Sequence, residues 1–155
     1  MIPDIVDLKA PIIPAESMGG FQLREHIKTY EDVISWFGII SSQITNQCST
    51  KYWEMRVPFQ INYEIRDSLV LIFNVLDGRL RHIIAYPSYK GTLFGEICMG
   101  MKISKAIQID SRIEFDEEEE VYHIPEIPGL AIDTTLDEDD VEVIDRIAVF
   151  TEEVS

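Results

Sequence analysis

Apolar and polar residues alternate along the middle of the chain, between Lys51 and Tyr86. Successive side chains of a strand point to opposite faces, so this period of two indicates strands with at least one buried face. Turn residues at Asp67 and Asp77-Gly78 separate the segments, and Asp-Gly is a strong signal for a tight hairpin. We therefore predict an antiparallel meander of four strands: Lys51–Val57, Gln60–Arg66, Ser68–Leu76 and Gly78–Tyr86.

A different pattern precedes the meander. Residues 1–14 contain three prolines, which lack a backbone donor and disfavour helix, so we expect an extended lead-in. Gly19-Gly20 predicts a turn with positive φ before a short strand at Phe21–Leu23. A helix is predicted next, with Thr29 and Asp32 as its capping pair. Its stop signal is Gly38. Its apolar face consists of Tyr30, Val33, Ile34 and Phe37.

The chain then repeats this opening. Residues Gly95–Met99 resemble Gly20–Leu23, and Lys102–Ile109 predicts a second short helix with Ser104 as its cap. The shared features are a glycine turn, a brief strand and a helix. They favour two similar β-turn-α units that flank a sheet.

The last third of the chain returns to strands. We predict them at Arg112–Phe115, Val121–Ile124, Leu130–Thr134 and Val141–Phe150. The closing strand is apolar on both faces, so we expect it inside the sheet. The acidic runs Asp116–Glu120 and Asp137–Asp140 are then expected at strand ends or loops. The whole pattern predicts an α+β fold in which short helices pack against a twisted antiparallel sheet, as a single domain of 155 residues.

Composition and cysteine use indicate a folded protein of the cytoplasm. Hydrophobic residues make up 46% of the chain, which excludes disorder throughout. Cys48 and Cys98 are far apart and lack any CxxC partner, so we expect two reduced thiols. The first residues lack the basic start and apolar run of a secretory signal. Apolar runs such as Leu69–Phe73 are too short to cross a bilayer.

The net charge of −15 is placed very unevenly. Residues 1–109 hold 11 acidic and 11 basic side chains, whereas residues 110–155 hold 17 acidic side chains and only Arg112 and Arg146. Nucleic-acid binding is excluded by this balance, because phosphate contacts need clustered Lys and Arg. The acidic C-terminal third instead indicates a surface that faces a basic partner.

A search for catalytic patterns finds little. His26, His82 and His123 are isolated, and the chain has no HExxH, GxSxG or GxxxxGK[ST] motif. The run Asp137–Asp140 lacks the glycine and distal glutamate of a calcium-binding loop. We interpret His82 as a structural histidine. No catalytic, cofactor-binding or metal-binding residue is predicted, and we do not expect an enzyme, although a pair of catalytic carboxylates stays open as an alternative.

The acidic runs have two interpretations, a solvated surface or a binding surface. They are interleaved with residues expected to fold, such as Tyr122 and Ile124, which favours binding. Carboxylates on an ordered scaffold accelerate encounter with a basic partner. Aromatic residues nearby, Tyr122, Tyr89 and Phe115, are either anchors for that partner or ordinary core residues.

Four stretches resemble bacterial immunity proteins of contact-dependent growth inhibition and related polymorphic toxin systems. They are Ile13–Leu23, Tyr89–Gly100, Tyr122–Gly129 and Ile147–Phe150. These stretches follow the order of that family from about residue 13 to residue 150. One departure is Arg24, at a position after the first short strand where the family pattern has glycine.

The resemblance implies a cytoplasmic inhibitor, without a cofactor, of a toxin domain that is commonly a nuclease. An acidic inhibitor of that kind could occupy the basic groove of an RNA-cleaving toxin as a mimic of its substrate's charge. Two alternatives stay open: a small carboxylate-dependent enzyme and an acidic adaptor without inhibitory activity. The candidate toxin-binding residues are Asp116, Glu117, Glu118, Glu119, Glu120, Tyr122, Asp137, Glu138, Asp139 and Asp140.

Overall fold

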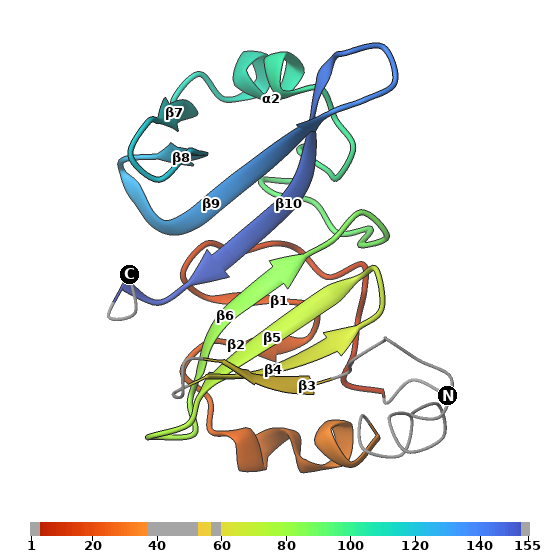
Figure 1. Ribbon diagram of the computed structural model, residues 1–155, viewed down its shortest axis with the longest axis vertical. Helices are drawn as coiled ribbons and strands as arrows, with labels where there is room; N and C mark the ends of the chain where they lie inside the picture. The colour runs from red at the N-terminus through yellow and green to blue at the C-terminus, as the bar shows by residue number, and fades with distance from the viewer. Residues whose placement is uncertain (1–3, 37–52, 57–59, 153–155) are drawn as a thin grey trace.

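The computed structural model describes residues 4–36, 53–56 and 60–152 (Figure 1). Within them, an antiparallel sheet has the strand order β3-β4-β5-β6-β10-β9-β8-β7, and β1 and β2 form a separate hairpin. The strands are β1 (Ser17–Met18), β2 (Phe21–Gln22), β3 (Trp53–Arg56), β4 (Gln60–Ile65), β5 (Leu69–Asn74), β6 (Leu80–Ala85), β7 (Glu114–Asp116), β8 (Val121–Ile124), β9 (Ile127–Leu136) and β10 (Glu142–Phe150). The predicted α+β fold in a single domain is confirmed.

Two short helical segments accompany the sheet. The 3-10 helix η1 (Ile27–Tyr30) continues into a helical turn at residues 31–36, and α2 spans Ile103–Ile109. Figure 1 shows the first segment at the lower end of the molecule and α2 at the upper end. No helix in the described part of the chain is both long enough and apolar enough to cross a membrane.

The predicted meander is confirmed, with one correction to its last turn. β3 to β6 pair in sequence, and Asp67 turns the chain between β4 and β5 at φ 57°. The β5–β6 connection is not a two-residue Asp-Gly turn. Asn74 N–H donates to Arg79 O at 2.9 Å and Gly78 N–H donates to Asn74 O at 2.8 Å, so the loop between Asn74 and Arg79 holds four residues. Gly78 closes this loop in the left-handed region.

The helix caps also differ from prediction. The first helical segment starts at Ile27, because His26 Nδ1 accepts a hydrogen bond from Lys28 N–H at 3.1 Å. Thr29 lies inside the segment, where its hydroxyl donates to Glu25 Oε2 at 3.3 Å. The second helix follows Lys102, which makes no side-chain cap, and Ser104 lies within it. Tyr30 and Val33 are buried as expected, whereas the predicted positions Phe37 and Gly38 lie outside the described residues.

One continuous core lies between the helical side of the sheet and the N-terminal segment. It includes residues of the two central strands, of both helical segments and of the lead-in. Tyr89 is only 1% exposed at its centre. Its hydroxyl donates to Ala10 O at 2.5 Å and accepts from Gly19 N–H at 2.9 Å. Tyr89 is therefore a core residue that ties the lead-in to the fold, and its interpretation as a partner anchor is wrong.

The predicted match of Gly20–Leu23 with Gly95–Met99 is wrong in register, because the matching hydrogen bonds relate residues 13–17 to residues 93–97. Ile13 and Ser17 exchange backbone hydrogen bonds across a tight loop, and Leu93 and Ile97 do the same. A turn follows each loop, with positive φ at Arg24 in the first and at Gly100 in the second. Arg24 thus has a left-handed backbone conformation. The equivalent residue in the second repeat is Gly100, and glycine is the residue type suited to that conformation.

The match extends from the turns into the sheet. Arg24 N–H and Glu25 O pair with the backbone of Leu80 at 2.8 and 2.9 Å. Gly100 N–H and Met101 O pair with Ile144 at 2.9 and 2.8 Å. Each turn leads into a helix and then into four antiparallel strands. We name residues 13–85 the first unit and residues 93–150 the second unit.

The two units are related by an approximate two-fold axis through the middle of the sheet. Their last strands, β6 and β10, lie side by side and antiparallel, with Ile84 opposite Ala148. Ile83 faces Val149 and Ala85 faces Ile147, and all four of these side chains are buried. Both helices contribute to the same core, so they cover the same face of the sheet. Among the described residues, no helix covers the other face of the sheet, which we call the open face.

Candidate functional site

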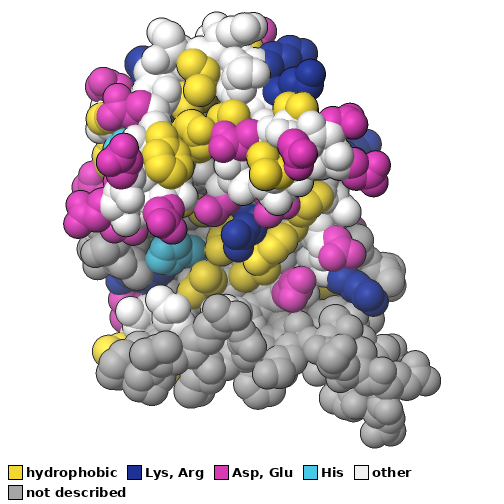
Figure 2. Space-filling model, turned by 45° about the horizontal axis from the view of Figure 1, so that its top comes forward, with side chains coloured by type: hydrophobic (Ala, Val, Ile, Leu, Met, Phe, Trp, Pro, Cys, Tyr) yellow, Lys and Arg dark blue, Asp and Glu magenta, His cyan; other side chains and the backbone are white. Residues whose placement is uncertain are grey.

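Both acidic runs lie on turns of the second unit. Asp116 closes β7 and residues 117–120 turn into β8, which we name the first acidic turn. The second acidic turn, residues 137–140, joins β9 to β10. Successive turns of a meander alternate between its two ends, so these two turns lie at the same end. Every residue of the two turns except Asp116 is exposed, and Figure 2 shows acidic side chains gathered on this part of the molecule.

Each acidic turn is ordered by its first aspartate. Asp116 Oδ1 accepts from the N–H groups of Glu118 and Glu119 at 2.9 and 3.2 Å. In the second turn, Asp137 Oδ1 accepts from two backbone N–H groups at 2.8 and 2.9 Å. Aspartate is suited to this role because its short side chain replaces the next backbone acceptor. The remaining carboxylates are therefore displayed on a defined backbone.

Tyr122 lies on the core side of β8, away from the open face. Its hydroxyl donates to Glu142 Oε2 at 2.7 Å, and its ring meets Phe115 edge-on at 5.1 Å between centroids. Burial, together with the Glu142 carboxylate, raises the pKa of Tyr122 to about 12. Tyr122 is thus half-buried and already hydrogen-bonded. Phe115, at 49% exposure, is the more exposed aromatic side chain of this pair.

The open face of the sheet carries a groove of about 350 Å³ beside the first acidic turn. We name it the open-face groove, and its lining residues are His82, Asp116, Glu119, Val121, His123, Leu130, Ala131, Ala148 and Phe150. Asp116 and Glu119 are the two predicted binding residues in it. The predicted residues Tyr122 and Asp137–Asp140 do not line it. Sequence reasoning missed its floor, which β9 and β10 supply.

His82 and Phe150 form one wall of the groove. They are opposite each other on β6 and β10, and their rings stack at 5.5 Å with an angle of 26° between planes. Burial lowers the pKa of His82, because the charged imidazolium is poorly solvated there. His82 is therefore neutral at pH 7 and adds no positive charge. Its interpretation as a structural histidine agrees with this packing.

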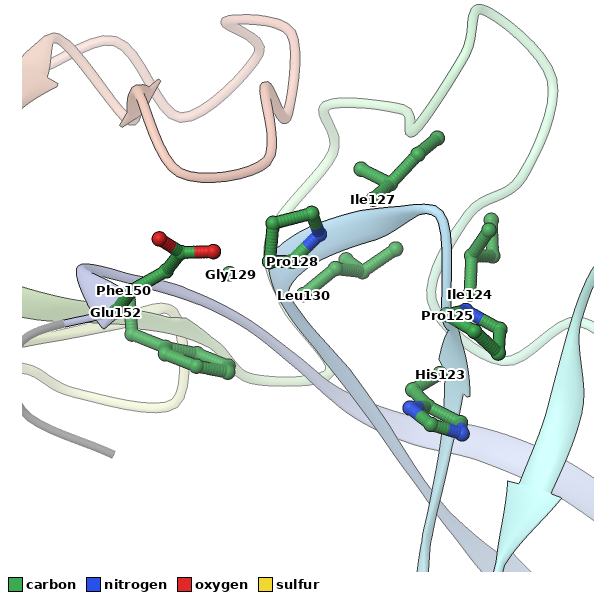
Figure 3. A pocket seen from close by; sticks show the side chains of 9 residues that line it. All are labelled: His123, Ile124, Pro125, Ile127, Pro128, Gly129, Leu130, Phe150 and Glu152. Atoms are coloured by element: carbon green, nitrogen blue, oxygen red, sulfur yellow. The ribbon is translucent and has the colours of Figure 1, made fainter.

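A second hollow of about 400 Å³ adjoins the groove (Figure 3). The two share His123, Leu130 and Phe150, and the hollow reaches further, to the β8–β9 turn and Glu152. Figure 3 shows Phe150 and His123 on opposite sides of it. His123 Nε2 lies 3.7 Å from Glu114 Oε1 on β7. Among the described residues, the groove and the adjoining hollow are lined by three carboxylate residues and by no Lys or Arg.

Metal-ligand and family comparisons add no assignment. Among residues 4–36, 53–56 and 60–152, no group of three or more His, Cys, Asp or Glu side chains could hold a metal ion. Cys98 is a free thiol, and Cys48 lies outside the described residues. Comparisons with models of protein families, with curated proteins and with solved structures found no match.

Proposed function

We propose that this chain is a cytoplasmic immunity protein that binds a basic toxin domain and blocks it. The observation that carries the proposal is the display of two acidic turns at one end of the second unit. The resemblance of four stretches to immunity proteins of contact-dependent growth inhibition supports the same function. An RNA-cleaving toxin is the favoured partner, because its substrate groove is basic and accepts negative charge.

Comparison of the two units supports a partner-directed role for the charge. The first unit contains eight acidic and seven basic residues, whereas the second contains 16 acidic and four basic residues. Both units nevertheless build the same order of loop, turn, helix and meander. The architecture therefore does not require the acidic excess. Crowded like charges repel one another and lower stability. Binding to a positively charged partner would offset this repulsion, which accounts for the acidic excess in the second unit.

The proposed mechanism is steering followed by occlusion. The two turns create a negative potential that draws a basic surface toward this end of the molecule. Contact then covers the toxin's active groove with carboxylates that stand in for phosphates. A few desolvated residues supply most of the affinity, and exposed Phe115 beside the first acidic turn is a candidate.

The test uses charge reversal on both turns, in the variant E117K/E118K/E138K/D139K. It leaves Asp116 and Asp137 in place because they order the turns, and Glu120 and Asp140 because their φ is positive. The matched control, D4K/E31K/D32K/E96K, reverses four exposed acids outside residues 110–155. Association with a basic protein domain that co-purifies with this chain from its own cells is measured by stopped flow at low and high salt.

We expect the turn variant to associate at least about tenfold more slowly at low salt and to lose most of its salt dependence. The control should stay close to wild type. Toxin activity is assayed in parallel. An unchanged association rate in the turn variant would reject the proposal, and a bound toxin that remains active would identify an adaptor instead.

A further inference from the structure

The open-face groove owes its shape to two small side chains in the centre of the sheet. Ala148 on β10 pairs directly with Ala131 on β9, at positions where large β-branched residues usually fill the surface. The neighbouring wall is the stacked pair His82 and Phe150. The groove is therefore a recess with an apolar floor and a flat aromatic side, on a face that the helices leave uncovered.

Carboxylates lie on two sides of this recess, while Arg146 precedes Ala148 on the same face of β10, next to Asp133 and Asp145. Asp116 and Glu119 stand at one side, and Glu152 lies in the adjoining hollow beyond Phe150. The lining residues that the structure describes include no Lys or Arg, and burial lowers the pKa of His82, which favours its neutral form. An anionic occupant is disfavoured by this arrangement. A purely apolar occupant would cover the Glu119 carboxylate without offering it a hydrogen-bond donor.

An arginine side chain matches each part of the recess. Its aliphatic stem can lie on the alanine floor, as long basic side chains commonly do on apolar surfaces. Its planar guanidinium stacks on aromatic rings and pairs with carboxylates through several N–H donors. Lysine offers a stem but neither a planar group nor the same fork of donors.

We propose that the open-face groove binds an arginine side chain from a basic segment of the protein partner, with Phe150 as its stacking platform and Glu119 as its carboxylate partner. This inference rests on the proposed function and names the partner chemistry of its recognition surface. Steering by the exposed turns and anchoring in the groove are then separate steps.

The first experiment separates anchoring from steering with two variants of equal charge. Glu117 and Glu119 belong to the same turn, but only Glu119 lines the groove. In the proposed complex the bound arginine covers the Glu119 carboxylate, whereas Glu117 stays exposed and is screened at about 0.15 M salt. At that salt concentration we expect E119Q to weaken toxin binding about tenfold and E117Q to change it less than about twofold. A131V fills the floor with a residue suited to strands and should weaken binding as well. Denaturant unfolding confirms that each variant is folded.

Equal affinities for wild type, E119Q and A131V would overturn the inference. If E117K/E118K/E138K/D139K still slowed association in that case, the proposed function would stand without the groove. Concentration-dependent dimers of the wild type that A131V abolishes would also overturn it, because a second copy would then occupy the groove.

The second experiment needs no toxin, so its outcome does not depend on the proposed function. The probes are the peptides acetyl-Gly-Gly-Arg-Gly-Gly-amide and its lysine counterpart, titrated into the labelled full chain and followed by NMR. We expect the arginine peptide to shift the amide signals of His82, Ala131 and Ala148 with millimolar affinity, and the lysine peptide to bind at least about threefold more weakly. Equal binding of the two peptides, or no shift at these residues, would overturn the inference.

Discussion

At the scale of single residues, Tyr89 shows how one hydroxyl joins segments that are distant in the chain. It bridges the carbonyl of Ala10 and the N–H of Gly19 inside the core. Burial raises the pKa of Tyr89 to about 12, so the hydroxyl keeps its proton. The carbonyl of Ala10 and the N–H of Gly19 therefore both have the Tyr89 hydroxyl as a hydrogen-bond partner inside the protein.

The variant Y89F tests this role. Removing the hydroxyl leaves a buried donor and a buried acceptor without their partner, so we expect a loss of about 1–3 kcal/mol in the free energy of unfolding. Urea denaturation followed by circular dichroism measures it. The control Y86F changes a half-buried tyrosine nearby and should shift stability by less than about 0.5 kcal/mol. A Y89F protein as stable as Y86F would contradict the prediction.

The buried imidazole of His82 makes a second residue-scale prediction, on pH. Its pKa in the folded protein lies below the unfolded value because burial disfavours the charged form. Between those two pKa values the unfolded chain binds more protons, so this contribution is fully present above about pH 6.5 and is lost as pH falls through the window. We expect H82Q to lose less stability than wild type between pH 7.5 and 5.5 in urea titrations. Parallel losses in the two proteins would contradict this origin.

At the scale of elements, tight turns set the path of both units, and their glycines are not equivalent. Gly20 and Gly100 both have positive φ, at 92° and 83°. A Cβ on Gly20 would lie 1.9 Å from Ile5 O, whereas nothing lies within 4 Å of one on Gly100. The turn at Gly20 is therefore limited by close contact with the lead-in, and the turn at Gly100 by backbone conformation alone.

Alanine substitutions separate these two effects. G100A should cost only the left-handed backbone penalty of about 1 kcal/mol. G20A should cost about 2–4 kcal/mol, because the backbone of the lead-in has to move as well. Thermal unfolding compares the two variants with wild type. Equal losses would show that the lead-in does not hold its close packing in solution.

At the scale of the whole molecule, the net charge of −15 opposes the compact state. Most of the repulsion is within the second unit, where the charges crowd. Salt shortens the range of such repulsion from about 30 Å at 0.01 M to about 8 Å at 0.15 M. Stability should therefore depend on ionic strength even without a partner.

We expect the melting temperature to rise between 0.01 and 0.15 M sodium chloride, by an amount equivalent to about 1 kcal/mol. Differential scanning calorimetry measures it. The neutralised variant E117Q/E118Q/E138Q/D139N should melt higher than wild type at low salt and respond less to added salt. A variant that responds to salt as strongly as wild type would place the repulsion elsewhere in the molecule.

The sequence by itself determined the features that depend on neighbouring residues. Alternation along β4 to β6, the glycine turn before β2 and the placement of both acidic runs between strands all follow from local sterics and burial. The four-residue loop after Asn74 and the helix start after His26 escaped prediction. These two segments contact each other, since Ile27 N–H donates to Gly78 O at 2.7 Å, and a linear pattern does not show such a contact.

Only the tertiary structure decided the open-face groove. His82, Ala131 and Ala148 come from three strands, and they meet because the last strands of the two units pair across the two-fold axis. That pairing depends on burying one face of each unit in a common core, which is a property of the whole chain. A linear pattern identifies which side chains share a strand face, and the strand order decides which strands place those faces side by side.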